Sequence, residues 1–84
     1  MALAFIRETT TDPRYSVWLL CNLETVELKD GPRDMPSEIY GSVLTPSTFT
    51  EADARSAFRL KKASDARLLA LLDDIIAAAD QEPR

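Results

Sequence analysis

Residues 64–80, SDARLLALLDDIIAAAD, are the part of this chain that most restricts its fold. On a helical wheel, the leucines and isoleucines cover about half of the circumference, and charged residues occupy the other half. Neither glycine nor proline interrupts the run, Ser64 is a candidate N-cap, and Pro83 follows the last turn. The pattern predicts an amphipathic helix whose apolar face must pack against another part of the protein.

A second helix is predicted directly before it, over residues 51–62. Thr50 and Asp53 have the spacing of a capping box, with aspartate in place of the usual glutamate. A single continuous helix would carry Lys61 and Asp65 into the apolar stripe and interrupt it. The sequence therefore favours two helices joined by a tight connection, an αα-hairpin.

The N-terminal half has the patterns of β-strands. Residues 15–23 are apolar all round a helical wheel, which suits a strand buried on both faces or a buried helix from Pro13 to Leu23; the leading Tyr, Val and Trp favour the strand. Trp18 is expected in the core, and Tyr40 at a loop edge with its hydroxyl in water. Strands are expected at residues 2–8, 15–23, 24–29 and 39–44, the last weakened by Gly41, with a loop over residues 30–37.

The fold class that follows is α+β, with a small antiparallel sheet of three or four strands packed against a C-terminal two-helix hairpin. A mostly α fold is the alternative. A chain of 84 residues supports one core, so residues 1–84 are expected to form a single domain. Its strand-rich part is 1–48, and its helical hairpin and tail are 49–84.

The sequence offers little for catalysis. It has no histidine, so the commonest general base is missing, and its two glycines cannot form a phosphate-binding loop. Cys21 is the only cysteine, and a buried structural thiol is favoured over a nucleophile because nothing would activate it. Asp73 and Asp74 read as part of a solvated helix face. We expect no enzyme activity, no cofactor and no metal.

No signal peptide or membrane-spanning segment is expected from the sequence. The N-terminal MALAFIRE has no basic region and too short an apolar segment for a signal peptide, and 18 apolar residues never run together. A single cysteine fits a reducing compartment. A cytoplasmic protein with no membrane partner is expected.

Charge is unevenly distributed along the chain. Net charge is −4, made up of −5 in residues 1–53, +4 in residues 54–67 and −3 in residues 68–84. The positive segment places Arg55, Arg59 and Lys62 on one helix face, with Arg67 beyond the turn. Such a face can bind a nucleic-acid backbone or an acidic protein, although pairing of Glu51 with Arg55 beside solvated neighbours is the simpler interpretation.

The leading functional hypothesis is a small, soluble, non-enzymatic protein-interaction module: a self-associating subunit, an adaptor or an inhibitor of a larger protein. The helix at residues 64–80 has a wider apolar arc than one packing surface needs, which makes Leu69 and Ile76 candidate partner contacts. The expected partner is another protein or a second copy, in a homo-oligomer or a heteromeric complex. A nucleic-acid-associated protein using the basic helix face, or an acidic decoy inhibitor of a nucleic-acid-binding complex, is the less favoured alternative.

Overall fold

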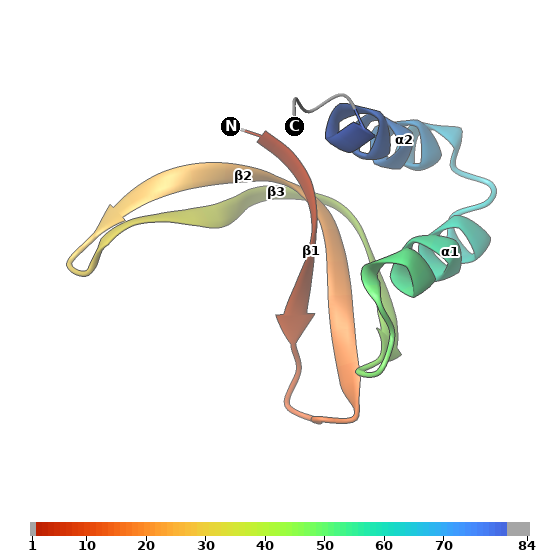
Figure 1. Ribbon diagram of the computed structural model, residues 1–84, viewed down its shortest axis with the longest axis horizontal. Helices are drawn as coiled ribbons and strands as arrows, with labels where there is room; N and C mark the ends of the chain where they lie inside the picture. The colour runs from red at the N-terminus through yellow and green to blue at the C-terminus, as the bar shows by residue number, and fades with distance from the viewer. Residues whose placement is uncertain (1, 81–84) are drawn as a thin grey trace.

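The computed structural model describes residues 2–80 and has an α+β architecture, as predicted: a three-stranded antiparallel sheet followed by two helices (Figure 1). The strand order β1-β2-β3 follows the chain, so each strand pairs with the one before it. The elements are β1 (Ala2–Thr9), β2 (Tyr15–Leu28), β3 (Gly31–Pro46), α1 (Glu51–Lys61) and α2 (Ala66–Asp80).

The β2–β3 hairpin is longer than the sequence pattern predicts. Residues 15–23 and 24–29 belong to one continuous strand, and the predicted helix alternative is wrong. The predicted loop over residues 30–37 is also wrong, because nearly all of it pairs with β2 after a tight turn at Lys29 and Asp30, which leads into Gly31 with a φ of +114°. Pro32 and Pro36 are tolerated because β3 is an edge strand and its outward-facing side needs no N–H donors.

Register shifts bend this hairpin away from the rest of the sheet. Leu20 pairs with Gly41 but Cys21 pairs with Ile39, which leaves Tyr40 as an extra residue on β3; a second shift follows at Ser37. Extra residues of this kind bend the strand that carries them. Beyond the bend, residues 24–35 form a two-stranded projection, the hairpin arm, which leaves the body of the molecule to the left in Figure 1.

Both helices lie on the outer side of the bent sheet (Figure 1) and cover its core-facing side chains. Phe5 stacks on Trp18 with ring centroids 5.2 Å apart and meets the edge of Phe58 at 5.6 Å. The prediction that Trp18 lies in the core is therefore confirmed. The core comprises Phe5, Trp18, Leu20 and Val43 of the sheet, Ala54 and Phe58 of α1, and Leu68 and Leu72 of α2.

Gly41 lets the helices approach the sheet closely. A Cβ at this position would lie 3.0 Å from Cδ1 of Leu68 and 3.4 Å from Cζ of Phe58. Next to it, the Tyr40 side chain is half-buried within β3; its hydroxyl accepts from Asn22 Nδ2 and donates to Glu38 at 3.2 Å. The expectation that Tyr40 lies at a loop edge is wrong, because the extra residue in β3 turns its ring toward the helices.

The helix boundaries follow from their caps. The predicted capping box of α1 is confirmed: the Asp53 amide donates to the Thr50 hydroxyl, and the Thr50 amide donates to the Asp53 carboxylate, both at 3.1 Å. α2 begins one residue later than the predicted N-cap implies, because Asp65, not Ser64, accepts from the Leu68 amide at 3.3 Å. The Asp65 amide donates to the Lys62 carbonyl at 2.8 Å, and this turn places Asp65 at the start of the helix.

Candidate protein-interaction face

The sheet face opposite the helices is apolar and is covered by no other element within residues 2–80. Side chains alternate between the two faces of a strand. Because Phe5, Trp18, Leu20 and Val43 point toward the helices, the residues between them point the other way. We call this set the open face: Ala4, Ile6, Val17, Leu19, Cys21, Leu23, Ile39 and Leu44.

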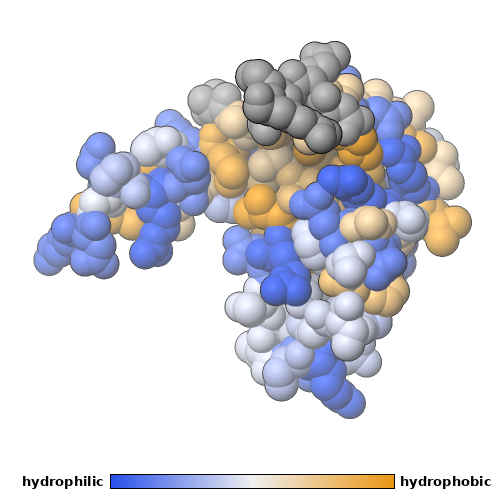
Figure 2. Space-filling view, in the orientation of Figure 1, coloured by the Kyte–Doolittle hydropathy of each residue, from blue (hydrophilic) through white to orange (hydrophobic). Residues whose placement is uncertain are grey.

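Burial across the open face falls from its centre to its margin. Cys21 is fully buried between its strand partners Ala4 and Ile39, whereas 56% of Ile39 and 59% of Leu44 are exposed. Hydrophobic surface gathers inside the bend, where the hairpin arm meets the body (Figure 2). Contiguous exposed apolar surface of this kind marks interaction sites in proteins.

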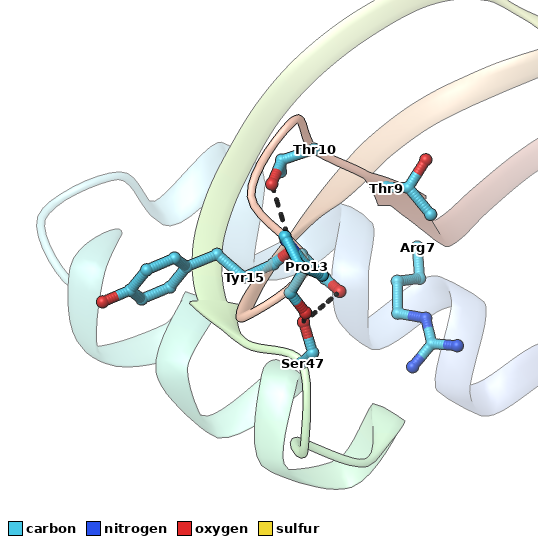
Figure 3. A pocket seen from close by; sticks show the side chains of 7 residues that line it. Arg7, Thr9, Thr10, Pro13, Tyr15 and Ser47 are labelled. Carbon is cyan, nitrogen blue, oxygen red and sulfur yellow. Dashed lines mark hydrogen bonds between the residues drawn. The ribbon is translucent and has the colours of Figure 1, made fainter.

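A hollow of about 340 Å³, lined by both polar and apolar surface, lies at the opposite end of the sheet from the hairpin arm. Ser47 closes one side by donating from its hydroxyl to the Pro13 carbonyl at 2.7 Å, and Arg7 lies across from it (Figure 3). Thr10 donates to the Tyr15 carbonyl at 3.1 Å. Thr10 and Ser47 therefore use their hydroxyls to hold the β1–β2 connection together, and the hollow lies at the end of that connection.

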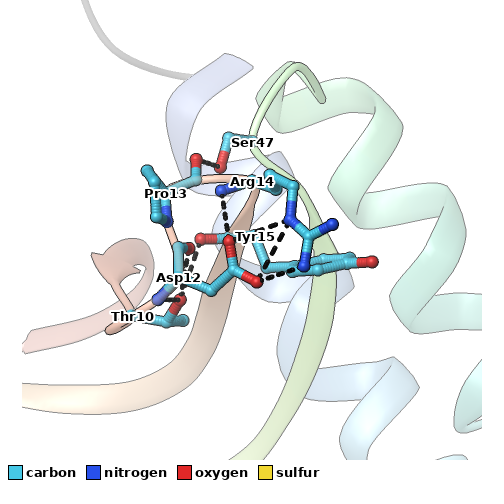
Figure 4. Close-up of polar contacts among 6 residues, drawn as sticks. All are labelled: Thr10, Asp12, Pro13, Arg14, Tyr15 and Ser47. Carbon is cyan, nitrogen blue, oxygen red and sulfur yellow. Dashed lines mark hydrogen bonds and ion pairs between the residues drawn. The ribbon is translucent and has the colours of Figure 1, made fainter.

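That connection is a compact hydrogen-bonded turn (Figure 4). The Asp12 carboxylate accepts from the Arg14 amide at 2.9 Å and from its guanidinium at 2.8 Å, and the Tyr15 amide donates to the Asp12 carbonyl at 3.1 Å. The Arg14 guanidinium lowers the pKa of Asp12, because the cation favours the charged carboxylate. The turn fixes how β1 enters β2, and its ion pair lies at the surface of the molecule.

The two apolar residues predicted as partner contacts lie on α2. Ile76 is half-buried and packs against the core cluster, and Leu69 is half-buried on the same helix. The most exposed large apolar side chain of the helices is instead Leu60 of α1, of which 81% is exposed.

The predicted basic residues are held largely by contacts within the chain. Arg55 pairs with Glu51, as the simpler interpretation of the sequence expects, and Arg59 pairs with Asp73 of α2. The Arg67 guanidinium lies 5.5 Å from the centre of the Tyr40 ring. Lys62 is the half-buried C-cap of α1. The structure therefore spreads these cations over separate intramolecular contacts.

Burial has one notable electrostatic effect on the open face. It raises the pKa of the Cys21 thiol above its ordinary value near 9.0, with a smaller contribution from the negative charge of Glu8. On the helix side, burial and the neighbouring Glu38 carboxylate raise the pKa of Tyr40. Both groups are thus neutral at physiological pH, and Cys21 behaves as an apolar packing residue.

The described residues contain no group of three or more histidine, cysteine, aspartate or glutamate side chains placed to hold a metal ion. Over the same residues, neither helix has the length and apolar character needed to cross a membrane. Comparison with family models, with curated proteins and with solved structures gives no match for this chain.

The open face is the feature that residue-by-residue interpretation of the sequence missed. Its signal was present in the segment YSVWLLCNL, whose apolar residues predict burial on both faces of a strand. The helices cover only one of those faces. Ile39 and Leu44 were missed because they belong to the segment that was expected to be irregular or weakly stranded.

Proposed function

We propose that this protein is a non-enzymatic protein-interaction module of the cytoplasm, and that it binds its partner through the open face. The observation that supports the proposal is an apolar sheet surface, with Ile39 and Leu44 more than half exposed, on the side away from the helices. Burying such a surface against a partner yields roughly 25 cal/mol for each Å² of apolar area removed from water.

The nucleic-acid alternative receives less support from the contacts of its residues. Arg55 and Arg59 are engaged by acidic side chains, and Arg67 by an aromatic ring. Binding a phosphate backbone would require these contacts to be exchanged for new ones, while the net charge of the chain stays negative.

The test is affinity capture from extract of the native host with three immobilised proteins. These are the wild type, the double variant Ile39→Ser with Leu44→Ser, and the control variant Leu60→Ser. All three substitutions replace exposed side chains, so each protein should fold; circular dichroism and thermal unfolding verify this. Light scattering of the purified proteins tests whether the partner is a second copy.

We expect the wild type and Leu60→Ser to recover the same protein, or to form the same oligomer, and the double variant to lose it. Leu60 lies on α1, on the opposite side of the sheet, and its replacement by serine is the same chemical change as Leu44→Ser. Recovery of the same protein by all three, or a wild-type monomer that recovers nothing, would refute the proposal.

A further inference from the structure

Resting on the proposed function, we propose that the occupant of the open face is a basic amphipathic helix of a partner protein. The first support is the charge at the margin of the face. The alternation that defines the open face also places Glu8, Glu27 and Asp34 on it, and all three are exposed. The strand residues described on this face include no lysine or arginine.

The basic residues of the sheet are accounted for elsewhere. Arg7 and Arg33 occupy positions of opposite alternation, on the side that carries the helices. Arg14, in the connection before β2, is neutralised by Asp12. The open face therefore presents an apolar centre with carboxylates toward both ends, and opposite charge on the partner would complement it.

The dimensions of the face suit a helix. Neighbouring strands lie about 4.8 Å apart, so three strands span about 10 Å, close to the diameter of a helix with its side chains. From Val17 to Leu23 the face extends about 20 Å at about 3.3 Å per residue. About 14 helical residues cover that length, and one further turn reaches Asp34, which pairs with Thr25, while Glu8 lies beside Val17 at the other end. The bend of the sheet, whose hollow side is away from the helices, adds to the fit (Figures 1 and 2).

Two other occupants fit less well. A second copy placed face to face would bring Glu8, Glu27 and Asp34 against the same three carboxylates, which disfavours self-association. An extended peptide added to the β3 edge would meet Pro32, Pro36 and Pro46, which lack amide donors for a new strand.

The proposal is tested with a fluorescent amphipathic peptide of about 18 residues, built from leucine on one face and lysine on the other. Two matched peptides serve as controls: one with glutamate in place of lysine, and one with the leucine–lysine composition scrambled so that no face is apolar. Binding is measured by fluorescence anisotropy at about 0.15 M salt, where nonspecific attraction between exposed charges is screened.

We expect the leucine–lysine peptide to bind at least about tenfold more tightly than either control peptide. The double variant at Ile39 and Leu44 should lose this binding, and Leu60→Ser should keep it. The triple variant Glu8→Gln, Glu27→Gln, Asp34→Asn should weaken it about tenfold. Its matched control is Glu24→Gln, Asp30→Asn, Asp74→Asn, which makes the same change in net charge at exposed acids off the open face and should bind as the wild type does.

The outcomes separate the two proposals. If both triple variants weaken binding equally, or if the glutamate peptide binds as well as the lysine peptide, the basic-helix inference is overturned while the docking face can stand. If the wild type forms a dimer and the double variant is a monomer, the basic-helix inference is likewise overturned and the docking face stands, because the occupant is then a second copy. If the double variant binds the lysine peptide as the wild type does and also captures the same protein from extract, the proposed function itself fails.

Discussion

Cys21 shows how a single residue connects the sheet to the surface we assign to binding. It is fully buried although no helix covers its side of the sheet, and it lies in the middle strand between Ala4 and Ile39. The accessibility of its thiol therefore reports whether the strands of the open face stay paired. A thiol in this setting is inert as long as the surrounding strands stay paired.

We predict that folded protein reacts with a thiol reagent at pH 8 at least about 100-fold more slowly than urea-unfolded protein, because reaction requires local opening.

The free energy of unfolding should also fall at alkaline pH. The pKa of Cys21 is raised by folding, so its contribution is complete below the ordinary value near 9.0 and is lost as pH rises through the folded value. Urea unfolding between pH 7 and 9.5 measures this loss.

The matched variant is Cys21→Ala, which should be somewhat less stable at pH 7 but should lose less stability between pH 8 and 9.5. Tyr40, whose pKa is also raised, titrates from an ordinary value near 10.0 and so adds its effect at higher pH. An identical alkaline loss in the wild type and in Cys21→Ala would show that the thiol is not responsible.

Gly41 is where packing between elements depends most on one residue. We predict that Gly41→Ala lowers the free energy of unfolding by about 1–2 kcal/mol, because the new methyl group must displace Leu68 or Phe58 in the core. Urea unfolding measures the loss, and Trp18 fluorescence should change because the core has moved. Gly41→Val should cost more.

The control is Gly31→Ala at the hairpin turn. Nothing lies within 4 Å of a Cβ placed there, so its cost of about 1 kcal/mol comes from the positive φ alone. Trp18 fluorescence should stay unchanged. If Gly41→Ala has the same free energy of unfolding as the wild type, the side chain of Leu68 can move aside without cost, and the close approach of the helices to the sheet does not require glycine.

The elements themselves were predicted best where local chemistry determines them. The capping box at Thr50 and Asp53 and the amphipathic pattern of residues 66–80 each signal a helix within a few residues, and both helices were found. The loop predicted over residues 30–37 failed for the opposite reason. Its Gly-Pro step and its proline at Pro36 read locally as breakers, but the pairing with β2 is long-range and tolerates them on an edge strand.

For the molecule as a whole, the sequence predicts more apolar surface than the chain can bury, but it does not show where the uncovered part lies. The surplus was expected at Leu69 and Ile76, on the helix with the widest apolar arc. In the structure Ile76 packs against the core, whereas Ile39 and Leu44 on the open face are more than half exposed, and the register shifts at Tyr40 and Ser37 decide which residues share that face. Pairing register is a property of two distant segments and cannot be deduced from either alone.

The hairpin arm gives a last prediction, about the stability of the molecule from one end to the other. Its strands pair only with each other and lie beyond the helices, whereas residues 18–20 are paired on both sides and packed under them. Amide hydrogens in residues 24–35 should therefore exchange at least about 100-fold faster than those of Trp18 and Leu20, measured by hydrogen–deuterium exchange. The leucine–lysine peptide should slow exchange at Cys21 and Leu23 and in the adjoining arm, while α1 is unaffected. Equal protection throughout β2 in the free protein would show instead that the arm unfolds only with the core, and that the open face is rigid before its partner binds.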